Sequence, residues 1–276
     1  VNGDFLVKKP KNLTSKQAMI LGTAGFTSLM SAFAIKAREE ILLGEKVKTV
    51  LVTGATGGVG KFLCKQFLEN GSKVYAIGRN EKKLLKLKEE FSLIKTYAYD
   101  FSNLENIDDL NQKIYEDSGG IDILINNAGL FNTLKLEDIE IVEYNRMFNI
   151  NLLAPILITK FHVKNMKKNQ WGRIFNIGSS SAYNGCELTS LYCASKHALL
   201  GFSRSISKEL QSSKIRVCNL SPSSIKTEMG KIPLSTYQDY NTFLSPEEVS
   251  EVLLFLCSFN ETMEVKELLL NRVDIQ

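Results

Sequence analysis

Tyr192 and Lys196 lie four residues apart in a segment with helical periodicity, so both side chains project from one face of the helix, a face that Ser195 does not share. A free phenol titrates at about pH 10, and a neighbouring ammonium favours the phenolate. The pair therefore suits general acid–base chemistry on an oxygen atom, with Ser179, thirteen residues before Tyr192, as an orienting hydrogen-bond donor. An isolated Tyr-x-x-x-Lys pair is also common on helix surfaces, which leaves a structural role open.

A glycine-rich turn is placed where it could hold the phosphates of a nucleotide. The β-branched run 47–52 leads into Thr-Gly-Ala-Thr-Gly-Gly-Val-Gly at 53–60, and a helical period follows. Such a turn lets the backbone approach a pyrophosphate, and the helix N-terminus offers it free N–H groups. The same glycines would also serve a tight turn that binds nothing. The predicted cofactor contacts here are Gly54, Thr56, Gly57, Gly58, Val59 and Gly60.

The next strand ends at Gly78-Arg79-Asn80, where a dinucleotide domain meets the adenosine ribose. A carboxylate at this place suits a ribose 2′-hydroxyl, whereas a cation suits a 2′-phosphate. Arg79 therefore predicts NADP(H), and the alternative is a solvated surface arginine. Lys82 could also reach a 2′-phosphate, although the basic run 82–88 is typical of a solvated helix face.

Strands and helices alternate from Lys48 onward at a spacing that requires parallel strands with right-handed crossovers. The sequence therefore predicts a doubly wound α/β fold, a parallel seven-stranded sheet in a Rossmann-type three-layer sandwich with an N-terminal helical extension. Ligands of such sheets bind at the carboxyl ends of the strands. The predicted strands are 47–52, 73–77, 95–99, 122–125, 173–177, 216–220 and 266–270.

Four motifs in register resemble the short-chain dehydrogenase/reductase family. They are the glycine turn, Asn126-Asn127-Ala128-Gly129, Ser179 and Tyr192-Cys193-Ala194-Ser195-Lys196. The resemblance covers about residues 48–276 and implies an oxidoreductase that moves hydride between a nicotinamide and a carbonyl or alcohol. The alternative is a nucleotide-sensing or scaffold protein that lost turnover, which the presence of both Tyr192 and Lys196 disfavours.

The resemblance also implies roles for individual residues. Ser179, Tyr192 and Lys196 would be catalytic together with Asn151, which would keep a water chain beside the lysine, and Lys196 would hold the nicotinamide ribose. The further cofactor contacts would be Asp100 and Phe101 near the adenine, Asn127 and Ala128 near its ribose, and Ile225 and Thr227 toward the nicotinamide. Pro222-Ser223 replaces the Pro-Gly of the family pattern, which puts the form of that turn in doubt.

The two ends depart from this pattern. Residues 1–60 resemble the start of the nucleotide region of medium-chain quinone or acryloyl-CoA reductases, so we expect a natural or constructed join and two parts, an extension at 1–46 and a catalytic domain at 47–276. The uncharged stretch 18–35 is diluted by Gly, Ser and Thr, which favours a packed helix over a membrane span. The glycine-free ending 265–276 weakens a role in fatty-acid synthesis.

Composition narrows the class of protein. The 276 residues are 44% hydrophobic and carry a net charge of +4, which fits a globular enzyme and disfavours nucleic acid as a partner. Five widely spaced cysteines without a C-x-x-C pair predict reduced thiols in a cytoplasmic protein, and His162 and His197 have no second ligand at metal spacing. We therefore expect no metal, a small-molecule substrate, and a homodimer or homotetramer.

Overall fold

The computed structural model describes residues 47–232, 239–257 and 263–272. The predicted helix within residues 1–46, the centre of the loop 226–245 and the last four residues lie outside this part of the chain. No helix within the described ranges is long and apolar enough to cross a membrane.

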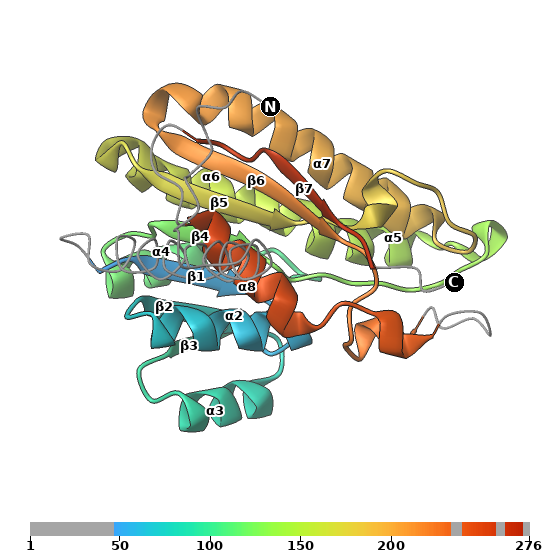
Figure 1. Ribbon diagram of the computed structural model, residues 1–276, viewed down its shortest axis with the longest axis horizontal. Coiled ribbons are helices and arrows are strands. Elements are labelled where there is room, and N and C mark those ends of the chain that lie inside the picture. The colour runs from blue at the N-terminus through green and yellow to red at the C-terminus, as the bar shows by residue number, and fades with distance from the viewer. Residues whose placement is uncertain (1–46, 233–238, 258–262, 273–276) are drawn as a thin grey trace, which may run out of the picture.

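Seven parallel strands form one sheet in the order β3-β2-β1-β4-β5-β6-β7 (Figure 1). The predicted doubly wound α/β fold is therefore confirmed, and each predicted strand is present with ends shifted by no more than two residues. The strands are β1 (Thr49–Thr53), β2 (Lys73–Gly78), β3 (Lys95–Ala98), β4 (Ile123–Asn126), β5 (Gly172–Ile177), β6 (Ile215–Pro222) and β7 (Glu267–Leu270).

Helices cover both faces of the sheet and give the three layers. On one face lie α2 (Gly58–Glu69), α3 (Glu81–Glu90) and α8 (Pro246–Cys257), and on the other lie α4 (Ile107–Ser118), α6 (Ala154–Asn169) and α7 (Ser190–Leu210). A shorter helix, α5 (Ile141–Phe148), continues through the π-helical turn Asn149–Leu153 into α6. π-Helical turns within α-helices occur frequently at functional sites, so this turn is a candidate part of such a site.

Two hydrophobic cores lie between these layers because successive residues of a strand face opposite sides of the sheet. In β1, Val50 and Val52 belong to the core under α2 and α8, whereas Leu51 belongs to the core under α4 and α6. All five residues of β1 are buried, as expected for the central strand of a parallel sheet covered on both faces. The sheet is thus a rigid support for the loops at its carboxyl edge.

Candidate active site

The glycine turn after β1 is packed so closely that side chains cannot replace its key glycines. Gly54 has a φ of +65°, and a Cβ atom there would lie 2.8 Å from the Cα atom of Ala128. A Cβ atom on Gly60 would lie 2.2 Å from the carbonyl oxygen of Gly54. Both positions therefore require glycine.

The N-terminus of α2 has the features of an anion site. Gly57 occupies the N-cap position and supplies no capping side chain, so the first N–H groups of the helix can bind a phosphate. Thr227 lies directly over this end, because a Cβ atom on Gly58 would be 2.4 Å from Thr227 Cγ2. Ile225 forms a parallel bridge with Leu244 that fixes this part of the loop after β6. The predicted contacts of the glycine turn and of Thr227 thus come together, and they fit a pyrophosphate.

Asn127 ties the turn after β4 to the glycine turn. The hydroxyl oxygen of Thr53 accepts hydrogen bonds from the backbone N–H groups of Asn127 at 3.0 Å and Ala128 at 2.9 Å. The Nδ2 atom of Asn127 donates to the carbonyl oxygens of Thr53 and Gly54 at 2.9 and 3.2 Å. The side chain of Asn127 therefore holds two loops together, so its effect on a bound nucleotide would be through the placement of that backbone.

Arg79 and Asp100 lie at the ends of β2 and β3 with 4.0 Å between Nη1 and Oδ2. Partial burial raises the pKa of Asp100, but hydrogen bonds from Ser102 and the charges of Arg79 and Arg146 outweigh it and hold this pKa below its ordinary value. Phe101 is only 6% exposed and its ring packs in the core under α4, so its side chain does not line the site. Arg79, whose side chain is 61% exposed, is accessible to an anion.

Tyr192, Lys196 and Ser179 meet at the carboxyl end of β5. Lys196 is 4% exposed, and its Nζ atom donates a 2.8 Å hydrogen bond to the carbonyl oxygen of Ile177 and lies 5.8 Å from the centre of the Tyr192 ring. The Ser179 hydroxyl is close enough to the Tyr192 phenol to lower its pKa. The three side chains that the sequence analysis singled out for acid–base chemistry are thus brought together.

Burial governs the acidity of this cluster. It raises the pKa of Tyr192 to about 12, a change that the Ser179 hydroxyl opposes, and it lowers the pKa of Lys196 to about 8. The expected lowering of the tyrosine pKa by the lysine is therefore not found in this structure, where desolvation of the phenolate is the largest influence. At neutral pH Tyr192 carries its proton and Lys196 its charge.

Asn151, in the π-helical turn, is completely buried beside the cluster. Its Oδ1 atom accepts a hydrogen bond from the backbone N–H of Leu130 at 2.7 Å, and its Nδ2 atom donates to the carbonyl oxygen of Leu130 at 2.9 Å and to Ser195 Oγ at 3.0 Å. A Cβ atom on Gly129 would meet Asn151 Oδ1 at 3.8 Å and Lys196 Nζ at 3.9 Å, so both side chains face this glycine. The side chain of Asn151 thus holds the loop after β4, while a link to Lys196 stays a prediction.

Phe131 borders Tyr192, and Leu188 precedes it by four residues in the chain; the sequence analysis singled out neither residue. The ring of Phe131 packs edge-on against Tyr192, with 4.7 Å between ring centres and 79° between ring planes. Leu188 has a φ of +60°, which is rare for leucine, and its carbonyl oxygen accepts a hydrogen bond from Leu134 at 2.8 Å. No sequence spacing predicts the ring contact of Phe131 or the left-handed backbone of Leu188.

Two other groups, His162 and Cys193, are of residue types that could do chemistry on the basis of the sequence. His162 is buried in α6 and burial lowers its pKa to about 4, and neither ring nitrogen has a hydrogen-bond partner among the described residues. Cys193 is buried, and its sulfur lies 3.3 Å from Thr189 Oγ1. In the part of the chain that the structure describes, no group of three or more acidic, histidine or cysteine side chains could hold a metal ion.

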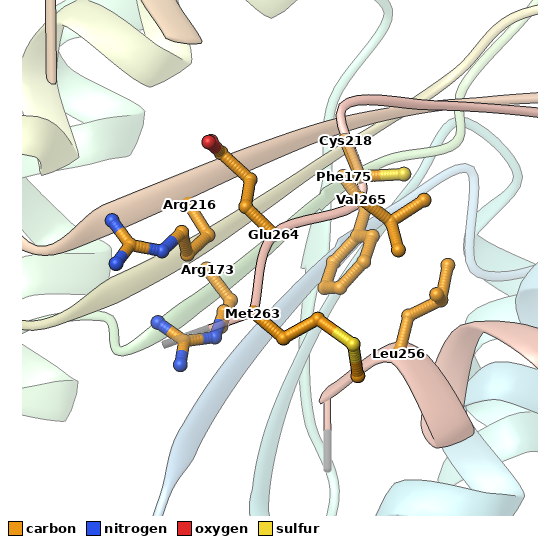
Figure 2. Close-up of a pocket in the computed structure, with 8 residues that line it drawn as sticks. All are labelled: Arg173, Phe175, Arg216, Cys218, Leu256, Met263, Glu264 and Val265. Carbon is orange, nitrogen blue, oxygen red and sulfur yellow. The ribbon is translucent and has the colours of Figure 1, made fainter. Parts of the chain in front are cut away.

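Figure 2 shows a small pocket where β5 and β6 face the end of α8. Arg173 and Arg216 stand near the amino ends of their strands, so the pocket lies away from the carboxyl edge that carries Tyr192. It is therefore separate from the candidate active site. Its lining residues are Arg173, Phe175, Arg216, Cys218, Leu256, Met263, Glu264 and Val265.

Comparisons with known proteins agree with this geometry. Residues 48–236 match the short chain dehydrogenase family. The 3-oxoacyl-[acyl-carrier-protein] reductase FabG of Aquifex aeolicus (strain VF5) is 32% identical over 231 residues, which cover 79% of this chain and 92% of that protein. The FabG protein of Rickettsia typhi (strain ATCC VR-144 / Wilmington) is 34% identical over 224 residues, which cover 76% of this chain and 89% of that protein.

Solved structures share the fold. ElxO with NADP bound is 26% identical and superposes with a TM-score of 0.72, covering 82% of this chain and 97% of ElxO. The acetoin dehydrogenase YohF from Salmonella typhimurium is 23% identical with a TM-score of 0.72, covering 82% of this chain and 95% of that protein. At that identity the second likeness concerns the fold alone.

Proposed function

The chain belongs to the short-chain dehydrogenase family, and from that premise we propose that it is an NADP(H)-dependent oxidoreductase that transfers hydride between the nicotinamide and a carbonyl or alcohol substrate. The observation that carries the proposal is the meeting of Ser179 and Tyr192 with the buried amine of Lys196, whose Nζ atom lies 5.8 Å from the centre of the Tyr192 ring. This cluster lies at the same edge of the sheet as the glycine turn, where ligands of doubly wound folds bind.

The proposed cofactor rests on residues that fit its phosphates. The N-terminus of α2 would hold the pyrophosphate, and Arg79 would pair with a 2′-phosphate. The solved structure of ElxO with NADP bound supports this choice. When bound, the nicotinamide would supply or accept the hydride.

The residues of the chain would manage the proton. In the direction of reduction, Tyr192 donates its proton to the substrate oxygen, and its pKa of about 12 keeps that proton available at neutral pH. Ser179 donates a hydrogen bond that orients this oxygen, and the ammonium of Lys196 stabilises the phenolate that Tyr192 becomes. The low exposure of Lys196 strengthens this charge interaction because little water screens it.

Two substrate classes remain. The FabG relatives favour a 3-oxoacyl thioester, whereas the glycine-free C-terminal residues favour a small free ketone, aldehyde or alcohol. Phe131 borders Tyr192 in this site and would present an apolar surface to either. We expect the second class, and a thioester such as acetoacetyl-CoA belongs in every substrate panel as the comparison.

The decisive experiment follows NADPH absorbance over a panel of ketones, aldehydes and 3-oxoacyl thioesters. Turnover that disappears in a Tyr192→Phe variant supports the proposal. Tight NADPH binding without turnover on any of these substrates would instead favour the alternative, a nucleotide-sensing or scaffold protein. The presence of Tyr192, Ser179 and Lys196 in one cluster supports the enzyme over that alternative.

We also propose the arrangement of the chain and its surroundings. Residues 47–276 would form the catalytic domain and residues 1–46 a separate extension, which the start of the family match at residue 48 supports.

A homodimer or homotetramer is supported by exposed apolar residues on α5, where Ile141 is 73% and Val142 58% exposed. The five cysteines form no disulfides, which supports a location in the cytoplasm. Mass photometry of the purified protein tests the oligomer.

A further inference from the structure

A row of polar residues crosses the sheet beneath the active site. Asn126, Asn176, Asn219 and Glu267 occupy one register position on β4, β5, β6 and β7. Residues in one register row point to the same face of the sheet, here the face that α6 and α7 cover. The three asparagines are no more than 2% exposed. Such a row in an otherwise apolar layer is stable only if its members bind one another.

Hydrogen bonds run along this row from strand to strand. Asn126 Nδ2 donates to Asn176 Oδ1 at 2.8 Å, and Asn176 Nδ2 donates to Ser203 Oγ on α7 at 2.8 Å. The Ser203 hydroxyl donates to the carbonyl oxygen of Leu199 at 2.7 Å and lies 3.4 Å from Asn219 Oδ1, and Asn219 Nδ2 donates to Ser221 Oγ at 2.7 Å. A connected buried network of this kind restricts each side chain to one arrangement.

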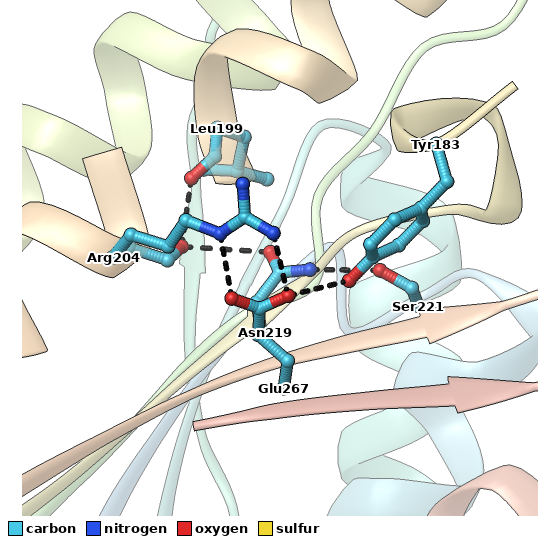
Figure 3. Close-up of polar contacts among 7 residues, drawn as sticks. Tyr183, Leu199, Arg204, Asn219, Ser221 and Glu267 are labelled. Carbon is cyan, nitrogen blue, oxygen red and sulfur yellow. Dashed lines mark hydrogen bonds and ion pairs between the residues drawn. The ribbon is translucent and has the colours of Figure 1, made fainter. Parts of the chain in front are cut away.

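The row ends in an ion pair that also binds a tyrosine (Figure 3). Arg204 on α7 donates to both carboxylate oxygens of Glu267, from Nε at 2.6 Å and from Nη2 at 2.9 Å. The phenol of Tyr183 donates to Glu267 Oε2 at 3.1 Å. The two-pronged ion pair therefore fixes the carboxylate that receives the Tyr183 hydroxyl.

Ser179 lies between two points at which its turn is attached to this row. On the near side, a Cβ atom on Gly178 would be 2.6 Å from Asn219 Nδ2, so the backbone just before Ser179 packs directly on the row. On the far side, Tyr183 follows the short turn Ser180–Ala182 and reaches Glu267. Movement of either attachment would move the Ser179 hydroxyl relative to Tyr192.

We propose that Tyr183, held by Glu267 and Arg204, is a positioning residue that keeps the Ser179 hydroxyl against the Tyr192 phenol. Glu267 belongs to the last strand of the sheet, so β7 supports the active site from the edge of the fold. This inference rests on the proposed function in one respect, because its effect on turnover presupposes that Ser179 and Tyr192 act on a substrate.

If Tyr183 only supported the fold, loss of its hydroxyl would lower the melting temperature and would have no selective effect on the chemistry of Tyr192. The Arg204–Glu267 pair has side chains that are 56% and 31% exposed, and pairs with that much exposure contribute little to stability. Loss of the Tyr183 hydroxyl should therefore leave the melting temperature nearly unchanged. A selective effect on the chemistry of Tyr192 is what distinguishes positioning from mere support of the fold.

The first measurement compares Tyr183→Phe with Tyr115→Phe, a matched control on α4 whose ring is partly exposed against Phe161. We expect Tyr183→Phe to lower kcat about three- to tenfold with little change in KM, as for loss of one hydrogen bond that acts in the transition state. Glu267→Gln should act in the same direction, and the double variant should lose less than the product of the single losses because both act through one contact. The control should behave as the unaltered protein.

The second measurement needs no turnover. In protein with isotope-labelled tyrosine, the NMR signal of the Tyr192 ring Cζ is assigned with Tyr192→Phe and is sensitive to the position of the neighbouring Ser179 hydroxyl. Tyr183→Phe should move this signal toward its position in Ser179→Ala, and Tyr115→Phe should leave it in place. An unchanged signal and unchanged kcat in Tyr183→Phe would overturn the inference. If the unaltered protein shows no turnover on any substrate, the proposed function fails, and the NMR signal still decides the position of Ser179.

Discussion

The Nζ atom of Lys196, on α7, donates a 2.8 Å hydrogen bond to the carbonyl oxygen of Ile177 at the end of β5. This contact places a buried amine beneath the loop that carries Ser179, and desolvation lowers its pKa to about 8. The charge that supports Tyr192 is therefore sensitive to mildly alkaline pH, and its titration gives the first prediction.

For carbonyl reduction, kcat/KM should be constant near neutral pH and fall above about pH 8, where Lys196 loses its proton. Tyr192 does not limit this range because its pKa is about 12. Initial rates measured from about pH 6 upward, in steps of about half a pH unit, give the pH profile. In Lys196→Arg, whose guanidinium stays charged, the remaining activity should lack this decline. A profile that stays flat well beyond pH 8 in the unaltered protein contradicts the assignment.

Tyr192→Phe should reduce kcat by about a hundredfold or more, because the variant lacks the proton-transfer group. The ring still packs edge-on against Phe131, so the fold and the affinity for NADPH should change little. Steady-state rates, fluorescence titration with NADPH and thermal melting separate these effects. Near-normal kcat in the variant would exclude Tyr192 as the acid.

The unaltered protein should bind NADPH more tightly than NADH, because Arg79 is exposed at the end of β2 and can pair with a 2′-phosphate. Arg79→Ala should weaken NADPH binding about ten- to hundredfold and leave NADH binding nearly unchanged, and Arg79→Asp should reverse the preference. Lys88→Ala, in the last turn of α3, is the charge control. Equal affinities for the two cofactors in the unaltered protein would disprove the role of Arg79.

His162 should make the protein sensitive to acid. Burial lowers its pKa from the ordinary 6.5 to about 4, so between these values the unfolded chain binds a proton that the folded chain does not. The free energy of unfolding should fall as pH drops from 6.5 toward 4, by up to about 3 kcal/mol. Urea unfolding across this range measures the slope. His162→Leu should remove most of the pH dependence of the unfolding free energy, and His197→Gln, on an exposed residue, should leave it unchanged. Equal slopes in both variants would assign this pH dependence to another group.

Removal of residues 1–46 should preserve NADPH binding and activity. β1 begins at Thr49, and strands of this sheet start at the edge opposite the candidate active site, so the preceding chain enters away from Tyr192. Cofactor titration and kcat of the shortened protein test this expectation. A marked loss of NADPH affinity would show that the extension contributes to the site and that the chain is one integrated enzyme.

The sequence determined the elements and the local pairs of the site. Apolar runs of strand length and helical periods repeat along the chain from residue 48, and this alternation is sufficient for a parallel sheet with helices on both faces. The glycine turn and the Tyr192–Lys196 pair were predictable for the same reason. Each depends on spacings within one strand-to-helix turn or one helix, which local geometry fixes.

Tertiary structure decided what joins distant segments and what depends on burial. Tyr183 is hydrogen-bonded to Glu267, 84 residues away in the sequence, and Phe131 packs against Tyr192 from another loop. No local spacing in the sequence predicts either contact. The pKa of Tyr192 was expected to fall because its neighbour is a cation, yet it rises because the packed site removes water from the phenol. Solvent access is a property of the whole fold, and for that reason only the assembled structure could decide the sign of this shift.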